Sequence, residues 1–167
     1  MSSHSDRTDG VKILRGSRMI EGVQVVPLRR IPDERGTIFH MLKCTDAHFS
    51  AFGEIYFSTL YRGVVKGWHK HRDMTLNYAC ISGSVKVVLY DDREQSPTSG
   101  GLVEVFIGAD AYSLVVIPPD VWNGMKGMTD PLAIVANCAT RPHDPTRSVR
   151  MDPHDSHIPY VWEAQDA

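Results

Sequence analysis

The 167-residue sequence has few cysteines, and no pattern of spacing pairs them. Its three cysteines, Cys44, Cys80 and Cys138, are an odd number, and none belongs to a Cys-x-x-Cys motif. A structural zinc site or a disulfide framework usually shows such paired spacing. We therefore expect buried thiols in a protein kept in a reducing cytosol, with a catalytic thiol as the less favoured alternative.

An excess of charge and a long apolar segment are also missing. The 18 Lys and Arg residues against 20 Asp and Glu residues give a net charge of −2, so no basic surplus exists to displace counterions from a nucleic acid. No apolar run approaches the roughly 18 residues that span a bilayer. The polar start MSSHSDRTDG lacks the apolar core of a signal peptide. The sequence thus predicts a cytoplasmic protein that binds neither nucleic acid nor membrane.

What the sequence has in quantity is short β-rich segments separated by Gly, Pro and Asp residues. The predicted strands are 23–28, 37–43, 53–61, 64–69, 76–82, 84–91, 102–107, 113–117 and 133–139. Many short strands at this spacing are typical of an antiparallel sandwich or barrel. Only the stretch DAHFSAFG, residues 46–53, suggests a short helix.

The length suffices for one domain with a core and is too short for two. Residues 1–18 are predicted to be a flexible N-terminal arm, and residues 19–167 a single domain. The alternation in VKVVLYDDRE and the continuous apolar run YSLVVIPP favour a closed, filled barrel. After Thr140 the chain is rich in Pro and Asp, which predicts an irregular C-terminal tail packed back on the barrel.

The segment GVVKGWHKHRDMTLNYACISG, residues 63–83, places two histidines at alternate positions of a predicted strand. Side chains i and i+2 of a strand point to the same face, so His69 and His71 should project together with Gly67. Two such imidazoles can be metal ligands, a catalytic base with a substrate-binding neighbour, or ordinary interior histidines. The spacing alone leaves all three interpretations open.

This segment resembles the first motif of the cupin superfamily: Gly, five residues, His-x-His, a short gap, Glu, six residues, Gly. Both glycines and both histidines match, but Leu76 stands where the glutamate belongs. In the second motif, Pro-x-Gly-x-x-His, the stretch PPDVWN puts Asn123 at the histidine position. Two imidazoles and a neutral amide make a poor divalent metal site. The resemblance implies an all-β, cupin-type double-stranded β-helix (a jelly-roll barrel), and the missing ligands argue against a metal.

A metal-free branch of the cupins matches more of the chain. The blocks PDERG, GVVKGWH, DDREQSPT, VVIPPDVWNG and VRMDPHDSHIPYVWE occur in the same order as in the dTDP-4-dehydrorhamnose 3,5-epimerase family. The chain resembles this family over residues 23–163. The resemblance implies a homodimeric isomerase that uses no cofactor and inverts carbons beside the 4-keto group of a nucleotide-linked 6-deoxysugar, in carbohydrate or polysaccharide biosynthesis.

The resemblance also assigns a base and its partner. In the family, a histidine of the pattern Arg-Gly-x-His removes the proton, and an aspartate of a late Asp-Pro pair supports it. These positions fall on His69 and Asp152. A neutral imidazole is a competent base near neutral pH, and a carboxylate on its other nitrogen fixes the tautomer and stabilises the imidazolium. We therefore expect a catalytic His69–Asp152 dyad.

Other family positions have changed in this chain. The family's proton-donating tyrosine falls on Ala136, which leaves another tyrosine (Tyr56, Tyr61 or Tyr78) or water to return the proton. Lys66 replaces an arginine and keeps its charge without the bidentate fork. The expected substrate-binding residues are Arg35, which the resemblance assigns to the nucleotide phosphates, and Glu54, Tyr56, Lys66, His71 and Asn123.

Taken together, these features predict a divergent nucleotide-sugar epimerase that inverts carbon 3, carbon 5 or both. A non-catalytic or altered-specificity cupin that binds a nucleotide-sugar is the alternative, because several contacts have changed. A metal-dependent cupin is less favoured. The expected partners are a nucleotide-sugar substrate and a second copy of the chain.

Overall fold

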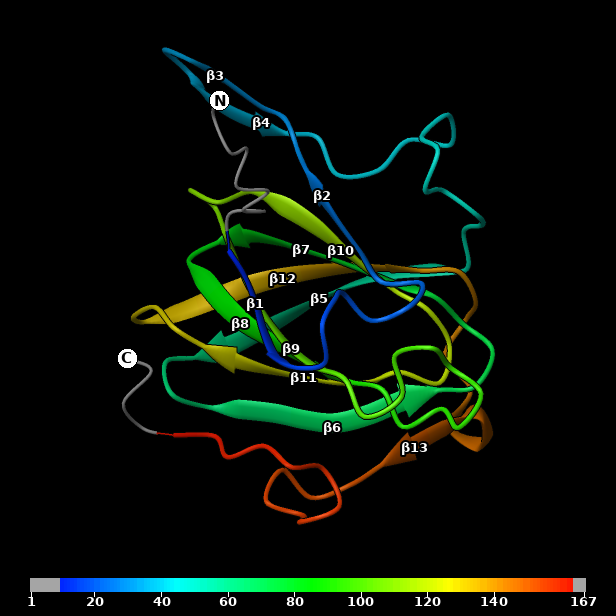
Figure 1. Cartoon of the computed structure of the whole chain (residues 1–167). Coiled ribbons are helices and arrows are strands. Elements are labelled where there is room, and N and C mark those ends of the chain that lie inside the picture. The colour runs from blue at the N-terminus through cyan, green and yellow to red at the C-terminus, as the bar shows by residue number, and fades with distance from the viewer. Residues whose placement is uncertain (1–9, 164–167) are drawn as a thin grey trace, which may run out of the picture.

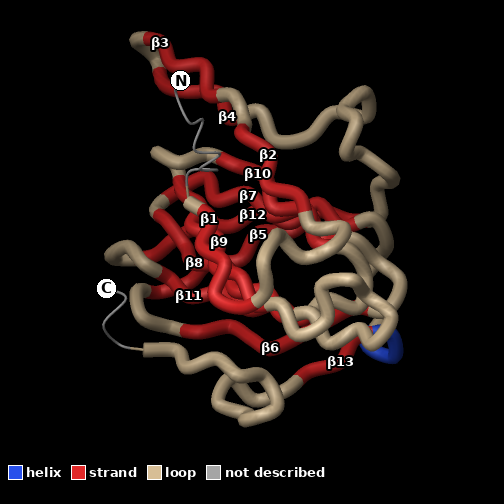
Figure 2. Tube along the Cα trace, viewed as in Figure 1, coloured by secondary structure: helices blue, strands red, loops and turns tan. Residues whose placement is uncertain are grey.

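The computed structural model describes residues 10–163, whose regular secondary structure is almost entirely β-strand (Figures 1 and 2). The elements in chain order are β1 (Val11–Arg15), β2 (Gln24–Pro27), β3 (Arg30–Asp33), β4 (Gly36–Phe39), β5 (Glu54–Tyr61), β6 (Val65–His71), β7 (Leu76–Ser82), β8 (Ser84–Tyr90), β9 (Leu102–Gly108), β10 (Ser113–Ile117), β11 (Trp122–Gly127), β12 (Leu132–Ala139), the short 3-10 helix η1 (Pro145–Arg147) and β13 (Ser148–Arg150).

Two antiparallel sheets form the barrel. The first has the order β1-β9-β8-β11-β6-β13 and the second β2-β10-β7-β12-β5, while β3 and β4 make a separate hairpin that projects from the barrel (Figure 1). Because sequence neighbours are often separated in these orders, the chain repeatedly crosses between the sheets, as in a jelly roll. The predicted all-β, jelly-roll class is confirmed.

Alternation along β8 shows how the sequence builds this barrel. Val85, Val87 and Leu89 are fully buried in the core between the sheets. Val88, between them, faces the opposite side and is buried as well, because the C-terminal segment covers that face. The sheet therefore has an apolar layer on each side.

The predicted tail does pack back on the barrel. Trp162 and Ile158 are buried against Trp68 on β6, and the centroids of the Trp68 and Trp162 rings lie 5.0 Å apart. The Trp68 indole N–H donates to the carbonyl of Pro153 at 3.1 Å. Gly124 on β11 makes room for this packing, since a Cβ there would lie 2.9 Å from Trp162.

Some expectations from the sequence need correction. Residues 1–9 of the predicted arm lie outside the described residues, but Val11–Arg15 is not part of a flexible arm, because it pairs with β9 as an edge strand. Residues 46–53 form a bend and a turn followed by irregular chain, instead of a helix. Strands β3, β11 and β13 were not predicted, because they are short or contain Gly or Pro, which are typical of turns. The pairing of β11 and β13 depends on partners distant in sequence, whereas β3 pairs with the neighbouring strand β4.

The cysteines also differ in part from expectation. Cys80 and Cys138 are buried, whereas Cys44 is exposed, and all three are free thiols. Burial raises the pKa of Cys80 to about 11, so this thiol is poorly suited to act as a nucleophile. Among residues 10–163 no helix has the length and hydropathy to cross a membrane.

Candidate active site

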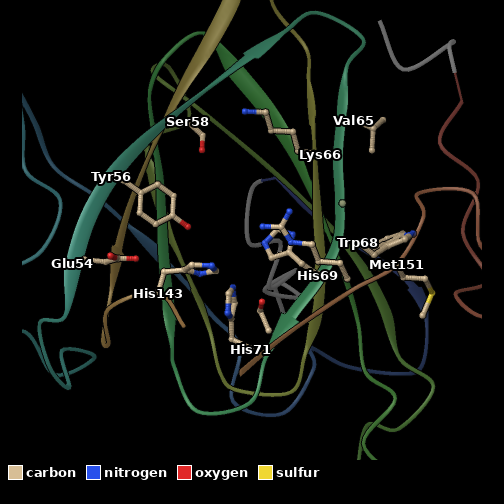
Figure 3. A pocket seen from close by; sticks show the side chains of 13 residues that line it. Glu54, Tyr56, Ser58, Val65, Lys66, Trp68, His69, His71, His143 and Met151 are labelled. Carbon is tan, nitrogen blue, oxygen red and sulfur yellow. The ribbon is translucent and has the colours of Figure 1, made fainter. Parts of the chain in front are cut away.

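A cavity of about 660 Å³ opens between β5 of one sheet and β6 and β13 of the other (Figure 3). Five of the eight expected site residues line it: Glu54, Tyr56, Lys66, His69 and His71. Strands from opposite sheets thus supply facing walls, with the histidine pair on one side and the β5 side chains on the other.

The β6 wall is shaped by an irregularity in its pairing with β11. Asn123 of β11 pairs with His69, but Met125 pairs with Lys66, so two β6 residues stand opposite Gly124 alone. Such a β-bulge changes which side chains share a face, and it brings both Lys66 and His69 to the cavity. Gly67 permits the close approach, because a Cβ there would lie 3.0 Å from the Cα of Gly124.

The cavity also contains residues that the sequence did not indicate. Ser148 and Arg150 of β13 pair with His71 and His69, and paired residues share a face. Both therefore line the cavity, as does His143 from the segment after β12. A three-residue strand has no detectable periodicity, so only its pairing with β6 places Arg150 beside the histidines.

His69 is held by a closed set of hydrogen bonds. Its Nε2 lies 3.2 Å from the Tyr78 hydroxyl, and that hydroxyl donates to Oδ1 of Asn123 at 3.1 Å. The Asn123 amide nitrogen donates back to the backbone carbonyl of His69 at 3.0 Å. Because a carbonyl only accepts, this last bond fixes which end of the Asn123 amide faces Tyr78.

This geometry defines the tautomer of His69. The single hydroxyl proton of Tyr78 goes to Asn123, so Nε2 of His69 must be the donor in the remaining bond. The neutral ring then carries its lone pair on Nδ1, which is the nitrogen that can accept a proton. Tyr78 and Asn123 together do what a carboxylate does in other histidine bases, but without adding negative charge.

The environment keeps His69 neutral. Burial is the main cause that lowers the pKa of His69 from 6.5 to about 4, and the positive charges of His71 and Arg150 lower it further. Desolvation disfavours the charged imidazolium, and the like charges act in the same direction. At neutral pH the side chain is therefore a free base.

A pH profile follows from this shift. Activity that needs neutral His69 should stay level from pH 7 down to about pH 5 and fall as pH approaches about 4, because protonation occurs only there. Initial rates of kcat/KM against pH would measure it, with circular dichroism at each pH to verify folding. His71→Gln should move the inflection upward, since it removes a repelling charge. An inflection at pH 6.5 in the native protein would contradict this account.

The expected hydrogen bond between His69 and Asp152 is not present in the described part of the chain. Asp152 is exposed, and its carboxylate accepts from the backbone N–H of His154 at 2.8 Å. The N–H of Asp155 in turn donates to the carbonyl of Asp152. Asp152 thus begins a local turn, for which Asp followed by Pro is well suited. It is therefore not the hydrogen-bond partner of His69.

Two expected substrate contacts also lie outside the cavity of their own chain. Asn123 is 1% exposed and lies beneath His69, so it positions the base instead of contacting a ligand. Arg35 is exposed at the turn of the β3–β4 hairpin, where it pairs with Asp33 at 2.6 Å. The hairpin projects away from the barrel (Figure 1).

The position assigned to the family tyrosine needs revision. Ala136 pairs with Ala79, which packs in the apolar cluster on the outer face of the second sheet. The inward residue of this stretch is Asn137, because it pairs with the core residue Tyr78. A side chain that acts in the cavity would stand at position 137, and alternation along the strand excludes position 136.

His71 has a polar atom available to a ligand. The side chain is largely buried and lines the cavity, with its ring centroid 5.7 Å from that of His69. Its Nδ1 is buried and has no hydrogen-bond partner among the described residues. Buried polar atoms are normally satisfied, so a substrate group that bonds this nitrogen would be stabilised there.

Within residues 10–163 no three His, Cys, Asp or Glu side chains are placed to hold a metal ion. The cavity's charges are those of Lys66, Arg150 and Glu54, with three imidazoles nearby. This arrangement suits an anionic organic ligand better than a cation.

Comparison with known proteins gives these residues a family. The model of the dTDP-4-dehydrorhamnose 3,5-epimerase family matches residues 17–167. The chain belongs to this family. Membership confirms the resemblance found in the five sequence blocks, and with it the prediction of a sugar-nucleotide epimerase of the isomerase class.

Two curated relatives of this epimerase family member cover most of its length. The probable low-salt glycan biosynthesis epimerase Agl13 of Haloferax volcanii is 33% identical over 143 residues, which are 84% of this chain and 88% of Agl13. The spore coat polysaccharide biosynthesis protein SpsL of Bacillus subtilis is 30% identical over 150 residues, 88% of this chain and 99% of SpsL.

A solved structure is also similar. The dTDP sugar isomerase from Desulfovibrio desulfuricans G20 is 46% identical, with a TM-score of 0.84 over 86% of this chain and 92% of the other. The fold described above is therefore shared with a dTDP sugar isomerase at substantial identity.

Proposed function

We propose that this epimerase inverts the carbon beside the ketone of a nucleotide-linked 4-keto-6-deoxysugar, with His69 as the base. A C–H next to a carbonyl is weakly acidic, so its removal needs a positioned base and stabilisation of the enolate. Nδ1 of His69 would take the proton. The observation that carries the proposal is the neutral, orientation-locked imidazole of His69 on the wall of the cavity.

Cations in the cavity support the proposed substrate class. Lys66 and Arg150 face the cavity near His69, and both can pair with phosphate oxygens or with a developing enolate. The guanidinium of Arg150 offers the planar fork that Lys66 lacks. The names of the relatives, a glycan biosynthesis epimerase and a polysaccharide biosynthesis protein, support a place in the synthesis of a surface carbohydrate.

We further propose a homodimer, as the family resemblance implies. Ile55 and Phe57 on the outer side of β5 are 50% and 60% exposed, an apolar surface that a second copy would bury. Arg35 does not line the cavity of its own chain, so its proposed role with the nucleotide phosphates requires the hairpin to reach a partner. Sedimentation equilibrium should give twice the chain mass of 18.7 kDa, and a monomer at micromolar concentration would contradict the proposal.

Solvent exchange tests the reaction. The purified protein is incubated in deuterium oxide with dTDP-4-keto-6-deoxyglucose, and the sugar is followed by proton NMR. Deuterium should enter at carbon 3, carbon 5 or both, and the position shows which centre is inverted. Substrate that binds but exchanges no hydrogen would refute the reaction and leave a binding protein.

We also propose a cytoplasmic location, which fits the three free thiols and a cytosolic nucleotide-sugar.

A further inference from the structure

We infer that Tyr56 is the second proton-transfer residue, which delivers a proton to the face of the substrate opposite His69. The inference rests on the proposed epimerase function. Inversion at carbon requires one group to remove a proton from one face and another group to return one to the other face. The position that the family resemblance assigns to that second group holds Ala136, which faces away from the cavity.

Tyr56 stands on the correct wall. It belongs to β5, whose side chains Glu54, Tyr56 and Ser58 line the cavity across from β6. In Figure 3 the phenol of Tyr56 and the imidazole of His69 reach into the cavity from opposite ribbons. A sugar ring bound between the two walls would present one face to each of them.

Hydrogen bonds orient the Tyr56 hydroxyl as a donor. Oδ1 of Asn137 accepts the backbone N–H of Asn77 at 3.1 Å, which turns the Asn137 amide nitrogen toward β5. That nitrogen donates to the Tyr56 oxygen at 2.9 Å. Since the oxygen is the acceptor in this bond, the hydroxyl proton is not used there, and no acceptor for it is found among residues 10–163. The same N–H would stabilise the phenolate left after proton transfer.

Asn137 on β12 also explains how a proton donor on β5 can replace one on β12. It pairs with Tyr56 on one side and with Tyr78 on the other, so the three side chains form an inward row across β5, β12 and β7. A hydroxyl lost from the middle strand is thus supplied from the neighbouring edge strand. Asn137 acts as a positioning residue for it.

The other candidates fit less well. Tyr78 is fully buried, donates its proton to Asn123 and contacts the base itself, so it lies on the side of proton removal. Tyr61 lies an odd number of residues from Tyr56 on β5, so its side chain points to the opposite, outer face, where it is 65% exposed. His143 lines the cavity from an exposed loop, and it is the alternative that an experiment must separate from Tyr56.

The proposed step balances without a cofactor. Nδ1 of His69 takes the proton from the carbon, and the C–H electron pair forms the enolate. The enolate carbon then takes the hydroxyl proton of Tyr56 on its other face, so a C–H bond forms as the O–H bond breaks. The phenolate regains a proton from solvent, which reaches Tyr56 because it is 41% exposed, and His69 releases its proton to solvent.

Tyr56→Phe separates the two half-reactions. In deuterium oxide with dTDP-4-keto-6-deoxyglucose, this variant should keep exchange close to the native rate, because His69 still removes the proton and returns deuterium to the same face. Inversion should fall by about 10²–10⁴-fold, the usual contribution of a general acid. Exchange is followed by NMR, and inversion by reducing the 4-keto group and identifying the resulting sugars.

Tyr90→Phe, on β8 and away from the cavity and from the outer face of β5, is the matched control and should leave both rates unchanged, and thermal melting verifies that each variant is folded. The inference is overturned if Tyr56→Phe inverts at the native rate, or if it loses exchange and inversion together. It is also overturned if His143→Gln alone loses inversion while keeping exchange. Failure of the proposed function looks different, since the native protein would then show no exchange at all.

Discussion

Replacing His69 with alanine should lower the rate of substrate hydrogen exchange and the rate of epimerisation together, each by about 10²–10⁴-fold. No other side chain on the β6 wall combines a neutral nitrogen with an orientation fixed by Tyr78 and Asn123. Solvent exchange measured by NMR reports the first half-reaction directly. Both activities should therefore fall together, in contrast to the separation expected for Tyr56→Phe.

A second variant distinguishes loss of the base from loss of the local structure. His69→Gln keeps an amide that can donate to Tyr78 but offers no basic nitrogen, so it should be as inactive as the alanine variant while binding dTDP with unchanged affinity. His154→Ala, at an exposed residue of the tail, is the control and should be fully active. Appreciable exchange by His69→Gln would show that another group is the base.

Trp68→Ala should cause the largest loss of stability, about 3–5 kcal/mol in the free energy of unfolding. The indole is 1% exposed and contacts the rings of Trp162 and Tyr160, so its removal leaves a cavity between the barrel and the tail. The bond to the carbonyl of Pro153 is lost as well. Urea denaturation monitored by circular dichroism measures the change.

Two further substitutions calibrate this effect. Trp68→Phe keeps most of the aromatic packing and should cost clearly less. Val161→Ala, at a side chain of the same tail that is 73% exposed, should change the free energy of unfolding by no more than about 0.5 kcal/mol. If Trp68→Ala and Val161→Ala had equal denaturation midpoints, the tail would not contribute to stability through this contact.

Local patterns in the sequence were sufficient for the barrel and for part of the cavity. Strands β7 and β10 were predicted to the residue, because apolar side chains and turn residues bound them clearly. The shared face of His69 and His71 followed from the two-residue period of a strand. The family blocks, taken in order, led to the epimerase family that the comparisons confirm.

The partners of His69 could not be obtained in this way. The family motif predicted Asp152 as the partner of His69, but the chain after β13 forms a local turn in which the Asp152 carboxylate bonds the backbone of His154 instead. Asn123, at the histidine position of the second cupin motif, was predicted to bind substrate, and only the pairing of β11 with β6 shows that it holds the base in place. A hydrogen-bond partner depends on register between strands far apart in sequence, and no local pattern specifies register.

The amino-acid sequence by itself determined the all-β class, the shared face of His69 and His71 and the family, since each depends on residue spacing along one strand or on the order of motifs. The tertiary structure alone decided the tautomer of His69, the entry of Arg150 into the cavity and the placement of Tyr56 opposite the base. These features arise where strands of two sheets meet, and a bulge or a one-residue shift in pairing changes which side chains face the cavity.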